Sequence, residues 1–129
     1  MANPNIVNVT TINGVTTYLT PSGTSAVSLL NNAASSGKVF KIESLVAANT
    51  TGSVANTTVS YYSNATAQGS APSGGTAYPI CSTVSVPANA SLVVIEKSNG
   101  IYLTENSCIS VTSGTGSALT YVVSYEDIS

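Results

Sequence analysis

Short apolar runs separated by turn-forming residues recur along almost the whole chain. Residues 38–49, 56–63 and 118–126 alternate apolar and polar side chains, and turn signals such as Pro87-Ala88-Asn89 and Asn99-Gly100 lie between such runs. Alternation with a period of two is typical of strands with one buried face. Short strands with regular turns predict an all-β fold, a two-sheet antiparallel β-sandwich of about eight to ten strands, jelly-roll or immunoglobulin-like in topology.

The expected strands can be placed from the alternation. The segment 26–34 is short enough to form either a helical turn or a strand, and we favour a strand. Asn13-Gly14 is expected to form a tight turn, and Asn106 a turn residue in the left-handed conformation. The predicted strands cover residues 5–11, 15–20, 26–34, 38–49, 56–63, 78–86, 91–96, 101–103, 108–112 and 118–126.

The chain length of 129 residues fits one domain, and we expect a single β-sandwich domain over residues 1–129. The most separable part is the N-terminal arm, residues 1–21, which could pair as a strand with a neighbouring molecule. Its alternating apolar residues Ile6, Val7 and Val9 are therefore candidate interface residues.

Charged side chains are scarce, and histidine is absent. Three lysines and five acidic residues make up 6% of the chain, for a net charge of −2. Catalytic arrangements of the Ser-His-Asp or Cys-His type are excluded, and the acidic residues are scattered apart from Glu126-Asp127 at the C-terminal end. We expect no enzyme activity, no cofactor, no metal site, no nucleic-acid partner and no membrane partner.

A weakly charged surface rich in hydroxyl and amide groups suits dense packing against other proteins. Leu45 falls on the polar side of its strand, which indicates a bulge or cover by a neighbouring chain. Tyr62 and Tyr78 border residues 64–75, which we expect to form an exposed, flexible contact loop. The apolar run within 91–96 is expected to be buried on both faces, inside the sandwich or under a partner.

Cys81 and Cys108 lie in strand-like runs, and we expect two reduced thiols, with a disulfide between adjacent strands as the alternative. The first residues carry no secretory signal pattern, and no apolar run approaches the length of a membrane span. These features predict a soluble protein made in the cytoplasm.

Several stretches of the last hundred residues resemble a group of small virion structural proteins of marine tailed phages, especially those that infect cyanobacteria. The most specific are "SVPANASLVVI" and the terminal "YVVSYEDIS". The resemblance implies a virion component made in the cytoplasm of a bacterial host, and it carries over no catalytic residue. We expect a capsid decoration protein that binds the major capsid protein or other virion subunits as a homo-oligomer, with a trimer as the first guess. The alternatives are a tail, neck or fibre subunit and a carbohydrate-binding adhesin module.

Overall fold

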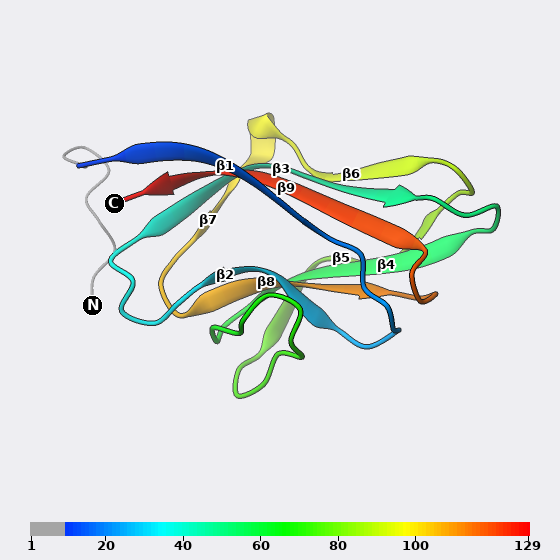
Figure 1. Ribbon diagram of the computed structural model, residues 1–129, viewed down its shortest axis with the longest axis horizontal. Helices are drawn as coiled ribbons and strands as arrows, with labels where there is room; N and C mark the ends of the chain where they lie inside the picture. Colours follow the sequence, from blue (N-terminus) through cyan, green and yellow to red (C-terminus); the bar gives the residue numbers. More distant parts are fainter. Residues whose placement is uncertain (1–9) are drawn as a thin grey trace.

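The computed structural model describes residues 10–129, which form two antiparallel sheets packed face to face as two layers (Figure 1). Sheet A has the order β1-β9-β3-β6, with β7 also pairing with β3, and sheet B has the order β2-β8-β4-β5. The elements are β1 Ile12–Leu19, β2 Val27–Asn32, β3 Val39–Asn49, β4 Ala55–Tyr62, β5 Ala77–Val86, β6 Ser91–Ile95, the 3-10 turn η1 Lys97–Asn99, β7 Ile101–Leu103, β8 Ser107–Ser113 and β9 Leu119–Ile128.

The strand order decides between the two topologies that the sequence left open. Six of the eight connections between consecutive strands cross from one sheet to the other, with β1, β3, β6, β7 and β9 in sheet A and β2, β4, β5 and β8 in sheet B. Layers of five and four strands connected in this way are wound as a jelly roll. The two-sheet sandwich predicted from the sequence is therefore confirmed, in its jelly-roll form.

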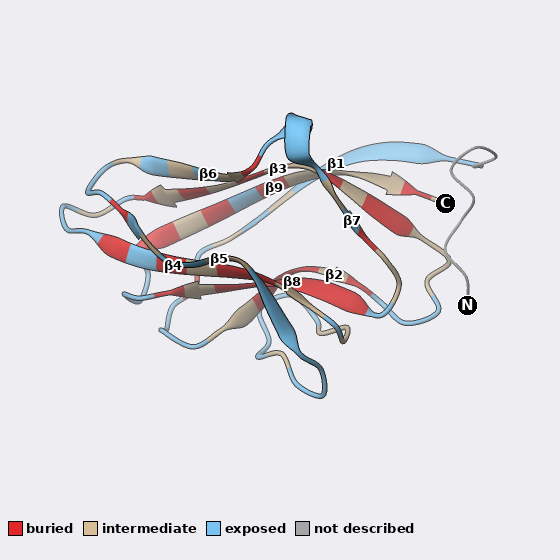
Figure 2. Ribbon diagram, turned by 180° about the vertical axis from the view of Figure 1, so that it is seen from behind, coloured by how far each residue is buried: buried red, intermediate tan, exposed pale blue. Residues whose placement is uncertain are grey.

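The inner faces of both sheets supply the core. In β9 the alternation predicted from the sequence is confirmed, because Leu119, Tyr121 and Val123 are fully buried while Val122 between them is exposed. Figure 2 shows buried positions along the strands of both layers. The largest fully buried side chains are Tyr121, Leu29, Ile42, Leu45, Ile95, Leu103, Ile109, Leu119, Val59, Val86, Val111 and Val123.

Tyr121 joins the two layers through its hydroxyl group. It projects from β9 of sheet A, donates a hydrogen bond to the Thr112 carbonyl of β8 (3.1 Å) and lies 2.6 Å from the Thr57 hydroxyl of β4. Burial raises the pKa of Tyr121 to about 12; the hydrogen bond from Thr57 acts in the opposite direction. The phenol is therefore held in its neutral form in the folded protein.

We expect the protein to lose stability in alkali because of this tyrosine. A phenol whose folded pKa of about 12 exceeds its unfolded value of 10 stabilises the fold fully below pH 10, and this contribution is lost as the pH rises through 12. The loss amounts to about 2 to 3 kcal/mol. Denaturant titrations between pH 9 and pH 12 should show a flatter decline for Tyr121→Phe than for the unmodified protein. The exposed Tyr102→Phe serves as the control, and equal slopes for all three proteins would contradict the prediction.

The alternation along β3 changes sides at a bulge, which corrects the prediction for Leu45. The register against β9 shifts between Ile42 and Ser44, so that Ile42 pairs with Tyr125 but Ser44 pairs with Ser124. Leu45 is consequently fully buried in the core, while Val46 lies on the outer face. The bulge inferred from the sequence is confirmed, but Leu45 as an interface residue is wrong.

Two further expectations are corrected by strand pairing. Asn13-Gly14 forms no turn, because both residues pair with Asp127 and Glu126 inside the continuous β1–β9 ladder. The apolar run of β6 is not buried on both faces, since β6 is an edge strand whose Val93 is 56% exposed.

Other local expectations are confirmed. The segment 26–34 contains strand β2 rather than a helical turn, and Asn106 has a φ of 57° in the turn between β7 and β8. Cys81 and Cys108 are both free thiols. Burial raises the pKa of each thiol, which keeps both in the protonated form near neutral pH.

Candidate docking surface

An apolar row crosses all four main strands on the outer face of sheet A. Val46 pairs with Val122 of β9 on one side and with Val93 of β6 on the other, and Val122 pairs with Tyr18 of β1. Paired residues of antiparallel strands project from the same face, so the four side chains are neighbours in one line. Tyr18 is 71% exposed and Val93 is 56% exposed, and these two residues end the row at the two edges of the sheet.

Hydroxyl and methyl groups flank the apolar row on both sides. On one side, Thr16 of β1 lies 2.9 Å from Ser124 of β9, hydroxyl to hydroxyl. On the other side, Thr20 lies 2.9 Å from Thr120, again hydroxyl to hydroxyl. Each of these two contacts satisfies one hydroxyl donor within the surface itself. We call this set the docking face: Tyr18, Val122, Val46, Val93, Thr16, Ser124, Ser44, Thr20, Thr120, Ala48 and Ser91.

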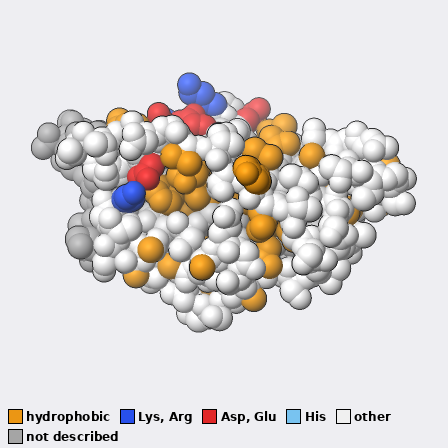
Figure 3. Space-filling view, in the orientation of Figure 1, with side chains coloured by type: hydrophobic (Ala, Val, Ile, Leu, Met, Phe, Trp, Pro, Cys, Tyr) orange, Lys and Arg blue, Asp and Glu red, His pale blue; other side chains and the backbone are white. Residues whose placement is uncertain are grey.

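The charged residues of sheet A lie at one end of the sheet, outside the docking face. Lys41 Nζ lies 3.6 Å from Glu43 Oε1, and Lys41 pairs in register with Glu126 of β9. Lys38 Nζ lies 3.1 Å from Asp127 Oδ2 near the same end. On the face seen in Figure 3, charged side chains gather toward one side, and most of the rest of that face carries none. Exposed pairs of this kind contribute little to stability, and here they leave the rest of the sheet uncharged.

Sheet B presents a different outer face, because residues 63–76 fold over it. We call this segment the strap. Its backbone bonds to β2 through Ser70 O, which accepts from Ser28 N at 2.9 Å, and through Gly69 N, which donates to Ser28 O at 2.8 Å. Cys108 and Ser28 on this face are fully buried. Figure 1 shows the strap in green on the far side of sheet B from sheet A. The exposure expected for the loop at residues 64–75 is confirmed over residues 67–71 and 73–75, and its role as a flexible contact loop stays a prediction.

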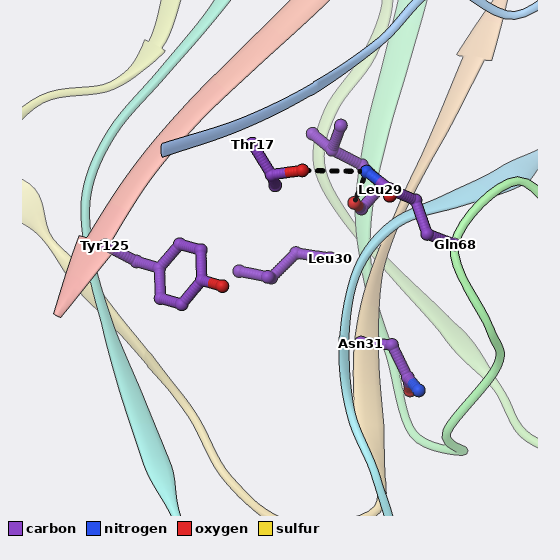
Figure 4. A pocket seen from close by; sticks show the side chains of 6 residues that line it. All are labelled: Thr17, Leu29, Leu30, Asn31, Gln68 and Tyr125. Atoms are coloured by element: carbon purple, nitrogen blue, oxygen red, sulfur yellow. Dashed lines mark hydrogen bonds between the residues drawn. The ribbon is translucent and has the colours of Figure 1, made fainter. Parts of the chain in front are cut away.

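Gln68 of the strap fastens the open side of the sandwich. Its Nε2 donates to the Thr17 hydroxyl and to the Leu29 carbonyl, both at 3.0 Å, and lies 3.3 Å from the Tyr18 carbonyl. It thus connects β1 of sheet A with β2 of sheet B, as Figure 4 shows. The cavity beside it measures about 180 Å³ and is lined by Thr17, Leu29, Leu30, Asn31, Gln68 and Tyr125.

Two cavities of the described residues differ in size and share an uncharged lining. The first is smaller than the usual ligand pocket, and the second, of about 290 Å³, lies where residues 19–25 approach Val27 and Gly69. Both are lined by uncharged side chains; Tyr125, whose pKa is raised by burial, is the only titratable group among them. Within residues 10–129, no three His, Cys, Asp or Glu side chains come together in a metal-binding arrangement.

The predicted interface residues do not converge on one surface. Tyr78 of β5 is 59% exposed, whereas Tyr62 is half-buried and its hydroxyl bonds to the Gly75 backbone of the strap. Both belong to sheet B, on the layer opposite the docking face. Leu45 lies in the core, and Ile6, Val7 and Val9 fall outside the described residues.

Sequence reasoning missed the residues that form the docking face. The exposure of Val122 could have been predicted, since it is the apolar residue on the polar side of the 118–126 alternation. Val46 has the same parity as the buried Ile42, so it would face the core if β3 had no bulge at residues 42–44. Val93 was missed because its run was expected to be buried on both faces.

Comparisons with protein-family models, with curated proteins and with solved structures found no match. No helix among residues 10–129 is long and apolar enough to span a membrane.

Proposed function

We propose that this chain is a virion structural protein that decorates a phage capsid, binding the outside of the shell through the docking face of sheet A. The observation that carries the proposal is the Tyr18–Val122–Val46–Val93 row, set among hydroxyl groups on the uncharged part of sheet A. Exposed apolar surface rimmed by polar groups is typical of protein–protein contact sites. The resemblance to small phage virion proteins supplies the particle as the partner.

The chemistry of the docking face favours an uncharged protein surface as its target. A charged group of the partner placed against the apolar row would lose its hydration shell and would find no counter-ion there. Binding would then depend on burial of apolar area and on shape, with little dependence on salt. A decoration protein bound at many equivalent sites stabilises the shell form that it prefers by mass action, even when each contact is weak.

Copy number in purified particles tests the assignment to the capsid. A decoration protein occurs on the order of hundreds of copies, at symmetry-related positions of the shell. About six or twelve copies would instead place the protein in the tail or neck. Its absence from particles, or binding of the isolated domain to glycans but not to shells, would reject the virion proposal.

Lysine substitutions test the docking face directly. We expect Val46→Lys and Val93→Lys to weaken binding to isolated shells by about 10- to 100-fold, because each places a charge in an apolar contact. Val54→Lys is the matched control, since Val54 is 58% exposed but lies in the β3–β4 connection, outside the docking face. Shell occupancy would be measured by co-sedimentation at several salt concentrations. Equal losses for all three variants would contradict the assignment of the face.

A further inference from the structure

Strand β1 forms a long, regular and uncharged edge of sheet A. Its eight residues pair with β9 without any register shift, and its sequence INGVTTYL contains no proline and no charged residue. Ile12, Val15 and Tyr18 are 55%, 36% and 71% exposed, and Figure 2 shows β1 as exposed along much of its length. An edge of this kind accepts another strand unless something blocks it.

The other edges of the sandwich carry such protection. The strap bonds to the backbone of β2 at Ser28, and the register of β2 against β8 is broken after Ser28. Strand β5 has two register shifts against β4 and contains Pro79. Strands β6 and β7 have only five and three residues. Within residues 10–129, β1 is therefore the edge best suited to strand addition.

The outward-facing backbone groups of β1 follow from its pairing with β9. Thr11 and Ser129 exchange two backbone hydrogen bonds, of 3.1 and 3.0 Å. Because bonded and non-bonded pairs alternate in an antiparallel ladder, the odd-numbered residues of β1 bond to β9. The N–H and C=O groups of Ile12, Gly14, Thr16 and Tyr18 therefore point away from β9. Gln68 Nε2 donates to the outward Tyr18 carbonyl at 3.3 Å, which agrees with this orientation and leaves the second lone pair of that oxygen for a partner strand.

We infer that β1 pairs in antiparallel with β1 of a second copy of this chain, across a two-fold axis. In the register that places Gly14 opposite Thr16 of the second copy, Ile12 lies opposite Tyr18 of that copy, and Val15 lies opposite its own equivalent. Each of the three exposed apolar side chains of β1 then lies opposite an apolar side chain of the second copy. The Ile12–Tyr18 pairs lie on one face of the extended sheet, and the Val15 pair lies on the other.

The charges near this edge do not oppose the pairing. The nearest ones, Glu126 and Asp127, belong to β9 and pair with Gly14 and Asn13. Two β9 strands would be separated by two β1 strands, or about 14 Å at the usual strand spacing. That distance exceeds the screening length of about 8 Å at physiological salt. The contact joins two docking faces into one wider sheet, and it favours a dimer over the trimer expected from the sequence. It does not depend on the proposed capsid function.

Self-crosslinking tests the register. In a protein with C81A and C108A, Val15→Cys should form a disulfide-linked dimer under mild oxidation, because the two Val15 positions lie opposite each other at the axis. Asn13→Cys is the matched control, since its opposite residue in this register is Thr17 of the second copy. We expect at least about ten times more crosslinked dimer from Val15→Cys than from Asn13→Cys. Equal yields, or none from Val15→Cys, would overturn the register.

Sedimentation over a concentration series tests the association itself. The unmodified chain should shift from monomer to dimer, and Thr16→Pro should weaken dimerisation at least about tenfold because proline removes an outward N–H group. Tyr18→Lys, which leaves the backbone unchanged, should act in the same direction if the proline variant folds poorly. Tyr102→Lys, at the opposite edge of sheet A, should dimerise normally. A chain that stays monomeric at all concentrations, or folded edge variants with unchanged affinity, would overturn the inference.

Discussion

Replacing Leu45 with alanine is expected to lower the free energy of unfolding by about 2 to 5 kcal/mol. Leu45 is fully buried, and it pairs with Val123 of β9 and with Ile95 of β6, both also buried. Truncation leaves a cavity that two paired strands cannot close without breaking their ladders. Urea denaturation followed by circular dichroism measures the loss.

Val46→Ala is the matched control for Leu45→Ala. The two residues are adjacent in β3 but lie on opposite faces of sheet A, so the Val46 variant should lose less than about 1 kcal/mol. The order should reverse in shell binding, where Val46 contributes to the docking face. A Leu45 variant as stable as the unmodified protein would mean that the bulge of β3 is placed wrongly.

Asn49→Ala is expected to cost about 2 to 3 kcal/mol, a large effect for one polar side chain. Asn49 is 3% exposed, and its Nδ2 donates to the Val86 carbonyl at 3.0 Å and to the Ser53 carbonyl at 2.8 Å. Its Oδ1 accepts from the Thr51 N–H at 3.0 Å and from the Thr51 hydroxyl at 2.8 Å. Removal of the amide takes this donor away from the carbonyl of the fully buried Val86, at the point where the end of β3 meets the end of β5.

An exposed asparagine provides the comparison. Asn56 is exposed and accepts one bond, from the Ser85 hydroxyl at 3.0 Å, so Asn56→Ala should change stability by less than about 0.5 kcal/mol. Thermal unfolding of both variants distinguishes the two environments. If the two losses were similar, the Asn49 amide would not hold the two strand ends together.

The sequence was sufficient to predict the fold class and most strands, because those depend on local patterns. Strand β9 is the clearest case, since Leu119, Tyr121 and Val123 are buried and alternate with polar or exposed residues. The turn at Asn106 was predictable for a similar reason, because asparagine adopts positive φ more readily than most residues.

The docking face was harder to predict because it depends on which strands become neighbours. A bulge reverses the orientation of every later residue in its strand, and the sequence indicated a bulge near Leu45 without locating it at residues 42–44. The exposure of Val93 follows from the edge position of β6, which is a property of the topology. The contacts of the strap with β1 and β2 could not be predicted, because the partners of Gln68, such as Thr17 and Leu29, lie far away in the sequence.

The strap and the docking face belong to opposite layers of the sandwich. A protein that attaches to a shell through sheet A would direct the strap outward, into the surrounding medium. The exposed stretch around Ser73 is therefore a natural insertion point for a foreign peptide, which the particle would then display in many copies without obstructing its own assembly.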